Sequence, residues 1–312
     1  MKKKILIIQG SNLKKINIKT DTSFFLGLEA QRRSYQIYYY EPKDLSFING
    51  KVTALCSKVK FVDNPKQPIK VLSKTVLNLL QAKLILIRSE PPFNQQYINT
   101  TFILEYISKK VRIINHPKAL REVPEKLFSL RLTKYMPQTL ISENLNEIKT
   151  FLKSNKKIVM KPIESYSGND VKLITKFNKS LINKFIKKYH HLMFQKFIPQ
   201  ISKGDKRVFI INGKIKGAIS RLPKKGSILS NMSKGASAKK IEISQHEIKI
   251  SKIVATELKK QNIYFAGIDF IQGKLIGDIN VTSPTGLKTY YDLTGINLAK
   301  YFFDNIYYLR SI

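Results

Sequence analysis

Short apolar runs alternate with amphipathic stretches through the first third of the chain. The runs expected to form strands are Ile5–Ile8, Gln36–Tyr40, Leu84–Ile87 and Val111–Ile114. A helical pattern begins near Asp21–Ser23, between the first two runs. This rhythm is typical of an open, mostly parallel sheet covered by helices, so we predict an α/β domain over residues 1–121. Asn49–Pro68 shows little periodicity and is predicted to be a surface excursion.

The pattern changes after Asn115-His116-Pro117. A helix is predicted over Pro124–Tyr135, because proline is favoured at the first helical position. Further on, Ile158–Lys161 and Val171–Ile174 flank a Ser-Gly-Asn turn and predict two strands. We therefore expect a small second domain over residues 122–200.

Hairpin signals dominate the last third of the chain. Two apolar runs lie on either side of Asn212-Gly213, a pair that favours a type I′ turn. Gln245–Lys260 has the pattern of a long helix. Residues 201–312 are therefore predicted to form an antiparallel domain. Within it, Pro223–Lys240 is rich in Lys, Ser and Gly and is predicted to be a mobile loop.

The next hairpin carries the strongest chemical signal, GIDFIQGKLIGDINVTSPTG over Gly267–Gly286. A two-residue turn at Gly273-Lys274 would set Asp269 directly opposite Asp278. Asn280 projects from the same face as Asp278, because side chains alternate along a strand. Two facing carboxylates repel, which favours a hard divalent cation such as Mg²⁺ between them. The alternative is a pair of solvated acids on an exposed strand.

Composition narrows the class of protein without choosing a function. With 312 residues, 43% of them hydrophobic, the chain can bury the core of one large domain or a few smaller ones. No apolar stretch approaches the ~20 residues of a membrane-spanning helix, and no signal peptide is evident. A cytoplasmic protein without a membrane partner is expected. Cys56 is the single cysteine, which excludes an internal disulfide and a cysteine metal cluster.

The formal net charge of +35 is extreme. Lysines are nevertheless scattered through the whole chain instead of forming a basic arm or an interleaved aromatic stripe. We therefore expect no specific nucleic-acid partner, although the charge should attract anionic ligands in a salt-dependent way.

Several other residues have chemistry that depends on where the fold places them. Lys126 and Lys161 could point ammonium groups into a cleft. Glu164–Asp170 could be a phosphate-covering turn, because small residues let backbone N–H groups approach an anion. Arg207, at the root of a strand, suits bidentate contact with phosphate or carboxylate. Each of these residues also fits an ordinary solvated surface position.

Taken in order, these segments resemble the prokaryotic glutathione synthetase family of the ATP-grasp superfamily over nearly the whole chain. The resemblance is carried by the hairpin above together with NIKTDTSFFLGLEAQRR (Asn17–Arg33), DLSFING (Asp44–Gly50), IRSEPPFN (Ile87–Asn94), NHPKALREVPEKLF (Asn115–Phe128) and GDKRVFIINGK (Gly204–Lys214). It implies an ATP-grasp fold of class α/β (α+β). Such a fold has an N-terminal mostly parallel domain, a central lid domain and a C-terminal antiparallel domain, with ATP held between the last two.

The reaction that the resemblance implies is the ligation of γ-glutamylcysteine to glycine through an acylphosphate, with ATP as co-substrate and ADP and phosphate as products. Mg²⁺, or Mn²⁺ in its place, is the implied cofactor. A homo-oligomer is also implied. Catalysis of phosphoryl transfer depends mainly on positioning and charge stabilisation. This explains why the positions that match the family's site are cations and metal ligands and include no nucleophile.

The resemblance also implies residue roles. Arg207 matches the arginine near the transferred phosphate, and the implied metal ligands are Asp269, Asp278 and Asn280. The nucleotide-binding positions are Lys126, Lys161, Gly168, Gln195, Lys196, Phe197 and Ile198. The positions that face the peptide substrate are Arg88, Asn231, Ser283 and Thr285.

The chain departs from the family pattern close to these positions. Ser165-Tyr166-Ser167-Gly168 replaces a glycine-rich loop, and Asp278 replaces a glutamate. Gly226–Ser237 keeps Asn231 and Gly235 but lacks the usual arginines. Two alternatives therefore stay open: an ATP-grasp ligase that joins a different carboxylate and amine, and a non-catalytic binder of nucleotides or nucleic acid.

Overall fold

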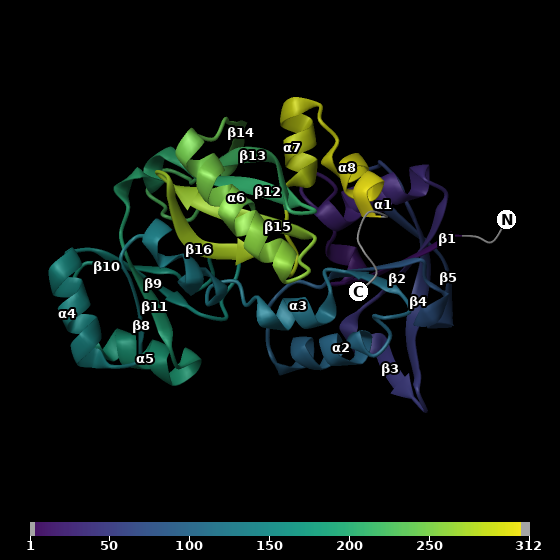
Figure 1. The fold of residues 1–312 in the computed structure, drawn as a ribbon, viewed down its shortest axis with the longest axis horizontal. Helices are drawn as coiled ribbons and strands as arrows, with labels where there is room; N and C mark the ends of the chain where they lie inside the picture. The colour runs from purple at the N-terminus through teal and green to yellow at the C-terminus, as the bar shows by residue number, and fades with distance from the viewer. Residues whose placement is uncertain (1–3, 307–312) are drawn as a thin grey trace.

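The computed structural model describes residues 4–306. Their strands form three sheets, each from a different part of the chain. Figure 1 shows the first sheet at the right, the small second sheet at the left and the third sheet in the upper middle. Within these residues, no helix is both long and apolar enough to cross a membrane.

The first sheet has the predicted parallel core. Its parallel strands, in sheet order, are β2 (Tyr35–Tyr40), β1 (Lys4–Gly10), β6 (Leu84–Arg88) and β7 (Arg112–Ile114). The helices of this part are α1 (Thr22–Arg32), α2 (Gln95–Glu105) and α3 (Pro117–Glu122), and the short 3₁₀ turns are η1 (Leu13–Lys15), η2 (Pro42–Asp44) and η3 (Leu79–Gln81). Asp21 caps α1, because its carboxylate accepts the Phe24 N–H at 2.9 Å.

An antiparallel extension of this sheet was not predicted. It consists of β3 (Leu45–Ile48), β4 (Lys51–Phe61) and β5 (Ile69–Asn78), with β4 paired to β2, β3 and β5. The expected surface excursion over Asn49–Pro68 is therefore wrong. Buried positions in β4 alternate up to Cys56, but the register between β4 and β5 shifts at Lys58/Val59. That bulge breaks the period of two in the buried positions, so the sequence pattern does not predict the strand.

The second sheet is antiparallel. Its strands, in sheet order, are β10 (Lys172–Ile174), β9 (Ile158–Pro162), β11 (Leu192–Lys196) and β8 (Thr139–Ser142). The helices α4 (Leu145–Asn155) and α5 (Lys179–Tyr189) pack on it. The two predicted strands on either side of the Ser-Gly-Asn turn are confirmed as β9 and β10.

The third sheet is antiparallel throughout. Its strands, in sheet order, are β14 (Ser237–Lys240), β13 (Lys214–Leu222), β12 (Asp205–Ile211), β15 (Phe265–Ile271) and β16 (Lys274–Asn280). Asn212 and Gly213 have φ of 51° and 68°, so the predicted type I′ turn is confirmed. The predicted helix over Gln245–Lys260 is also confirmed, as α6.

Two helices at the end of the described chain, α7 (Leu287–Thr294) and α8 (Leu298–Asn305), pack against α1. The remaining 3₁₀ turns are η4 (Phe128–Tyr135), η5 (Pro199–Lys203) and η6 (Met232–Lys234). Pro223–Lys240 contains η6 and the edge strand β14. Its mobility stays a prediction.

The apolar cores join the first and third sheets and leave the second sheet with a core of its own. One cluster combines Leu6 of β1 with Phe209 of β12, and another combines Ile7 with Val208. The second sheet instead packs on a separate cluster within Ile148–Phe194. The domain boundaries predicted from the sequence, 1–121, 122–200 and 201–312, stay predictions.

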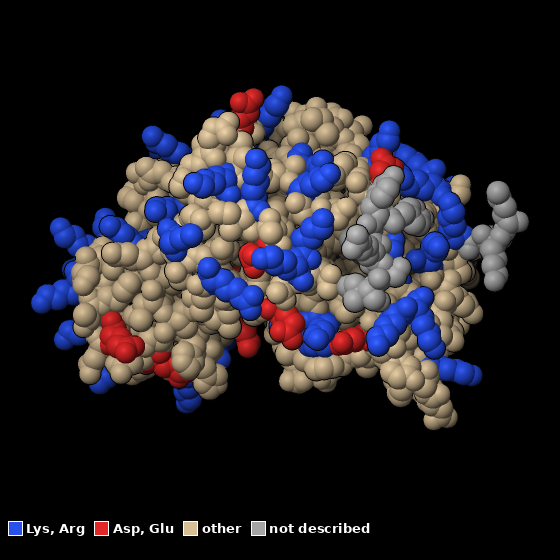
Figure 2. All heavy atoms as spheres, viewed as in Figure 1, with Lys and Arg blue, Asp and Glu red and all other residues tan. Residues whose placement is uncertain are grey.

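On the face shown in Figure 2, lysine and arginine side chains are scattered over all three parts. This distribution is the one expected from the even spread of lysines along the sequence.

Asn115 joins the first part of the chain to the third sheet. Its Nδ2 donates to the carbonyl oxygens of Phe265 and Val281, both at 2.7 Å. Its Oδ1 accepts the N–H groups of Tyr264 and Phe265, both at 2.9 Å. The side chain is 4% exposed, so the amide uses its full bonding capacity inside the protein.

We expect Asn115→Ala to destabilise the fold by at least about 3 kcal/mol, because it leaves buried backbone donors and acceptors without partners. Chemical denaturation measures the change. Asn146→Ala is the control, since Asn146 is exposed on α4, and a surface change of this kind should stay within about 0.5 kcal/mol. Equal losses in the two variants would contradict the importance of the Asn115 bonds.

Candidate active site

The hairpin between β15 and β16 turns one residue earlier than predicted. Gln272 and Gly273 occupy the turn with φ of 47° and 71°, values typical of a type I′ turn. A bulge that includes Gly277 (φ 82°) then shifts the register of the two strands. Asp269 therefore faces the bulged segment of β16, and the expected direct pairing with Asp278 is not formed.

The Asp269 carboxylate lies buried between two arginines. Arg207 donates from Nε and Nη2 to the two carboxylate oxygens, at 2.8 and 2.7 Å. Nη2 of Arg221 lies 2.9 Å from Oδ2 of Asp269. Arg221 also forms a bidentate pair with Asp205, with an Nε to Oδ1 distance of 2.8 Å. These four residues are 2 to 6% exposed and form one buried ion cluster.

Burial opposes the ionisation of Asp269, but the charges of Arg207 and Arg221 outweigh it and hold the pKa of Asp269 below its usual range. The repulsion expected between Asp269 and Asp278 is offset, because each carboxylate has cations of its own. The metal role of Asp269 stays a prediction.

Asp278 lies between two lysines. Nζ of Lys161 is 3.6 Å from its Oδ2, and Nζ of Lys126 is 4.0 Å from its Oδ1. Lys161 also donates to the carbonyl oxygen of Ile276 at 2.9 Å, and Lys126 donates to that of Ile163 at 3.2 Å. Burial lowers the pKa of Lys126, and the negative charge of Asp278 opposes this shift. The two lysines and Asp278 thus converge on one point.

The helix predicted over Pro124–Tyr135 is formed only in part, as the 3₁₀ helix η4 over Phe128–Tyr135. Glu125 and Lys126 lie in a turn, and η4 is interrupted at Leu132, where φ is −124°. The carbonyl oxygen of Glu125 accepts the N–H of Ile279 at 3.2 Å. This bond ties the segment to β16 and brings Lys126 to the site.

The Asn280 amide is oriented with its nitrogen inward. Nδ2 lies 3.2 Å from the carbonyl oxygen of Gly267 and 3.3 Å from Oδ2 of Asp269. Within residues 4–306, no hydrogen bond to Oδ1 of Asn280 is formed, so this oxygen is free to bind a cation. Asp278 and Asn280 therefore fit a magnesium ion that takes its other ligands from phosphate and water. In the same residues, no three His, Cys, Asp or Glu side chains are grouped to hold a metal by themselves.

These side chains line a cavity between the second and third sheets, which we call cleft 1. Its other walls include Ser165–Gly168, Gln195–Ile198 and Ile228–Asn231. All the predicted nucleotide-binding and metal-binding residues therefore lie around one space.

Gly168 lies where two covering loops meet. Its φ is 71°, and an added Cβ would be 2.7 Å from Oδ1 of Asn231 and 3.1 Å from Cδ2 of Leu229. Lys234 also joins the loops by donating to Oδ1 of Asn169 at 2.7 Å. Only glycine therefore fits this close approach without strain.

The end of β11 offers backbone groups to cleft 1. Gln195 is buried and donates from Nε2 to Oγ1 of Thr139 at 3.1 Å. The N–H groups of Lys196 and Phe197 are bonded to other backbone carbonyls. In contrast, the N–H of Ile198 has no protein acceptor within the described residues, so it is available to a ligand.

A second cavity, cleft 2, lies between the first part of the chain and the third sheet and has a volume of about 470 Å³. Arg207, Arg221, Asn231 and Asn280 line both clefts, so the two spaces adjoin. The predicted substrate-facing residues Ser283 and Thr285 line cleft 2.

Arg88 lies beneath cleft 2 and is 5% exposed. Its Nε donates to Oγ of Ser23 at 3.1 Å, and its Nη2 donates to the carbonyl oxygen of Pro284 at 2.8 Å. Arg88 is therefore placed to hold the Ser283–Thr285 loop in position, and it is absent from the lining of both clefts. Its predicted contact with substrate stays a prediction.

Arg221, Asp205 and Glu125 also line the clefts, and sequence reasoning missed them. Asp205 pairs with Arg221 only because the β12–β13 register shifts between Phe209 and Ile210. The Asn212-Gly213 turn alone would put these two residues one place out of register. Glu125 accepts a hydrogen bond from Thr282 Oγ1 at 2.8 Å. This contact joins segments that are distant in the sequence, so no local pattern predicts it.

The fold defines the class of this protein as ATP-grasp. D-cycloserine synthetase DcsG superposes with a TM-score of 0.66 at 12% identity, over 97% of this chain and 99% of that chain. D-alanyl-alanine synthetase A from Vibrio cholerae superposes with a TM-score of 0.62 at 12% identity, over 98% of each chain. At these identities the likeness establishes the fold alone.

Sequence comparison establishes the family. The models of the prokaryotic glutathione synthetase N-terminal domain and ATP-grasp domain match residues 4–121 and 125–295. Glutathione synthetase of Bradyrhizobium diazoefficiens is 35% identical over 308 residues, which cover 97% of this chain and 98% of the relative. That of Buchnera aphidicola subsp. Baizongia pistaciae is 37% identical over 298 residues, with 93% and 92% covered. The chain belongs to the prokaryotic glutathione synthetase family.

Glu125 provides a test of the electrostatics of the site. Burial raises its pKa, although Lys126 and the Thr282 bond act in the opposite direction. The folded protein therefore binds this proton more tightly than the unfolded chain, so the contribution of Glu125 to stability falls as the pH rises above the usual value of 4.5.

We expect the stability of Glu125→Gln relative to the unmodified protein to increase between about pH 4 and about pH 8, because glutamine carries no proton to lose. Chemical denaturation across this range measures the difference. The surface variant Glu242→Gln is the control. A Glu125→Gln curve parallel to that of the unmodified protein would contradict the assigned shift.

Proposed function

We propose that this chain ligates γ-glutamylcysteine to glycine and converts ATP to ADP and phosphate in the same reaction. One observation carries the proposal: Arg207 and Arg221 lie where cleft 1, lined by two lysines, Asp278 and Asn280, adjoins cleft 2. Phosphoryl transfer to a carboxylate requires nucleotide and acceptor in adjoining spaces with fixed positive charge between them. The names of the two bacterial relatives support this choice of substrates.

We infer that ATP binds in cleft 1. The free N–H of Ile198 would donate to the adenine ring, and Lys126 and Lys161 would contact the phosphates. The loops that meet at Gly168 would cover the phosphates. Within the predicted domain of residues 122–200, the second sheet and its two helices would act as the lid, since this sheet has a separate core and can move against the third sheet without repacking. Phe128, Leu132 and Met136 pack in the large core instead and would stay with the third sheet.

Mg²⁺, or Mn²⁺ in its place, would be held by Asp278 and by Oδ1 of Asn280. A divalent ion bound there supplies positive charge that neutralises the phosphate oxygens. Asp269 is the least available of the three predicted ligands, because two guanidinium groups already occupy its carboxylate.

The reaction would proceed in two steps. An oxygen of the cysteinyl carboxylate attacks the γ-phosphorus of ATP, the bond to the β-phosphate oxygen breaks, and an acylphosphate and ADP result. The glycine amine then attacks the acyl carbon, phosphate leaves with the electrons of the C–O bond, and the amine proton passes to solvent. Arg207 and Arg221 would stabilise the negative charge that develops at the junction of the clefts in both steps.

The test is to incubate the purified protein with MgATP and γ-glutamylcysteine, with and without glycine, and to measure ADP and the tripeptide. We expect one ADP for each tripeptide formed, and only when all substrates are present. ADP formation with another carboxylate and amine but not with this pair would indicate a ligase of different specificity. Nucleotide binding without turnover of any pair would indicate a non-catalytic binder.

The expected homo-oligomer and cytoplasmic location also stay predictions.

Asp278→Asn should lower magnesium-dependent turnover at least about tenfold. Loss of a residue that only supports a metal ligand already costs about tenfold or more, and Asp278 is a proposed ligand itself. Initial rates measured against magnesium concentration show the effect. Asp278→Glu is the matched control, because it keeps the charge and adds one methylene, and we expect it to retain metal-dependent activity. Full activity of Asp278→Asn would remove Asp278 from the metal site.

A further inference from the structure

Cleft 2 carries two acidic side chains that the proposed reaction does not use. Asp21, the N-cap of α1, and Glu90, just after β6, line the wall formed by the first part of the chain. Arg207 and Arg221 line the wall formed by the third sheet. The volume of about 470 Å³ falls in the range of ~300–1,000 Å³ for small-molecule sites. Cleft 2 is therefore a ligand-sized space with two carboxylates on one wall and, on the other, two guanidinium groups that Asp205 and Asp269 hold in place.

The simplest alternative is that Asp21 and Glu90 only balance the buried charge of Arg88. Burial lowers the pKa of the Arg88 guanidinium, and the charges of Asp21 and Glu90 oppose that shift, so the three groups do interact. The hydrogen bonds of Arg88, however, go to Ser23 and to the carbonyl oxygen of Pro284. Neither carboxylate therefore forms a hydrogen bond with Arg88 within the described residues.

The carboxylates also have bonding capacity to spare. Asp21 uses Oδ1 to accept the Phe24 N–H at 2.9 Å, and its Oδ2 makes no hydrogen bond within the described residues. The Glu90 carboxylate likewise forms no hydrogen bond and no ion pair within the described residues. The backbone N–H of Glu90 donates to Oγ of Ser11. The third acid of the cleft, Glu125, is in contrast bonded to Thr282. Asp21 and Glu90 are therefore free to accept hydrogen bonds from a cationic ligand.

We propose that Asp21 and Glu90 bind the α-ammonium group of the γ-glutamyl residue and so orient the dipeptide with its cysteinyl carboxylate towards Arg207 and Arg221. The inference rests on the proposed function and adds the residues that select the substrate. A dipeptide with an ammonium group at one end and the reacting carboxylate at the other matches the two walls of the cleft. The reverse orientation would put the ammonium group against two guanidinium groups.

Glycine is the less suitable partner for the two acids. Its amine must lose a proton and reach the acyl carbon beside Arg207 and Arg221, on the opposite wall. A carboxylate pair that held glycine as an ammonium ion would keep the amine protonated and away from the reacting atom.

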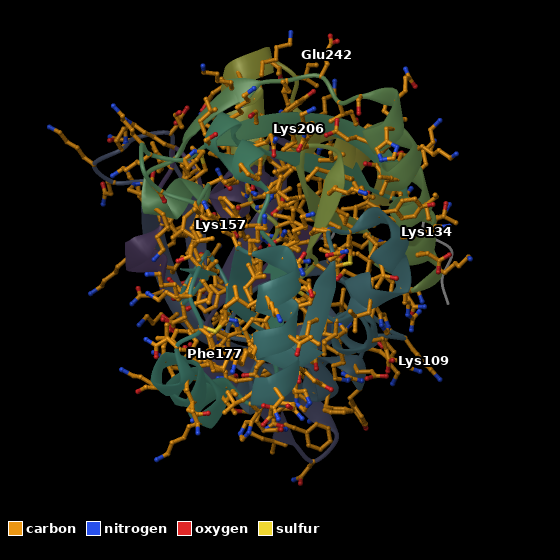
Figure 3. The ribbon with its side chains drawn as sticks, turned by 90° about the vertical axis from the view of Figure 1, so that its left-hand side faces the viewer. Lys109, Lys134, Lys157, Phe177, Lys206 and Glu242 are labelled. Carbon is orange, nitrogen blue, oxygen red and sulfur yellow. The ribbon has the colours of Figure 1, made fainter. Side chains whose placement is uncertain are left out.

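The experiment compares two donors, γ-glutamylcysteine and glutarylcysteine, which is the same molecule without the α-amino group. The variant is the double substitution Asp21→Asn and Glu90→Gln. Asparagine keeps the cap of α1, and glutamine keeps the size of the side chain, so both changes remove charge alone. Glu242→Gln is the control, because it removes a charge from an exposed residue on the outer part of the third domain (Figure 3).

We expect the double variant to lose about 10- to 100-fold in kcat/KM for γ-glutamylcysteine, because the ammonium group then faces neutral amides and loses the charge-assisted part of its hydrogen bonds. Its kcat/KM for glutarylcysteine should match that of the unmodified protein, and the KM values for ATP and glycine should not change. The preference for the amino-bearing donor would then disappear in the double variant and persist in Glu242→Gln.

An equal loss with both donors, no loss with either, or a rise confined to the KM for glycine would overturn the assignment of Asp21 and Glu90. Absence of any γ-glutamylcysteine turnover by the unmodified protein would refute the proposed function itself, and the inference with it. The two failures are distinguishable, because only the first requires an active unmodified enzyme.

Discussion

Asp269 holds two guanidinium groups inside the third sheet, and the placement of both clefts depends on that ion cluster. Burying charges costs free energy unless every charge is paired and hydrogen-bonded. Strand pairing supplies the partners here, since Asp205 and Arg207 lie on β12, Arg221 on β13 and Asp269 on β15. Removing one member would leave the opposite charge unpaired in the sheet. The register of three strands, more than any loop, therefore fixes where the two clefts meet.

The cations divide into two groups with different chemistry. Arg207 and Arg221 are planar, form bidentate pairs and lie in the sheet, so their geometry is fixed before any ligand arrives. Lys126 and Lys161 carry compact charges on flexible chains, and their present partners are backbone carbonyls and Asp278. Phosphate oxygens can replace such partners at small cost. In the proposed function, the arginines would supply rigid charge at the reacting centre and the lysines exchangeable charge along the nucleotide. Such a division suits phosphoryl transfer.

The sequence predicted the elements whose signals are local. Asn212-Gly213 and the helix over Gln245–Lys260 were recognisable because turn chemistry and helical period act over a few residues. The Gln272-Gly273 turn was misplaced by one residue because Gln272 adopts a positive φ that is uncommon outside glycine. β4 was missed because a bulge shifts its register by cross-strand contacts that no local pattern records. The same limit hid Arg221, whose partner Asp205 comes into register through a bulge. Family resemblance supplied most of the site, and tertiary packing supplied the rest.

The second sheet has its own core, and the bonds that join it to the third sheet across cleft 1 are polar. Lys161 reaches the Ile276 carbonyl, and Lys234 reaches Asn169. Separating the two sheets would leave the core of each intact and break bonds that water can replace. The change in heat capacity follows the exposure of apolar surface, so it should be small for this movement. The balance between open and closed forms would then vary only gently with temperature, unlike the stability of the fold itself.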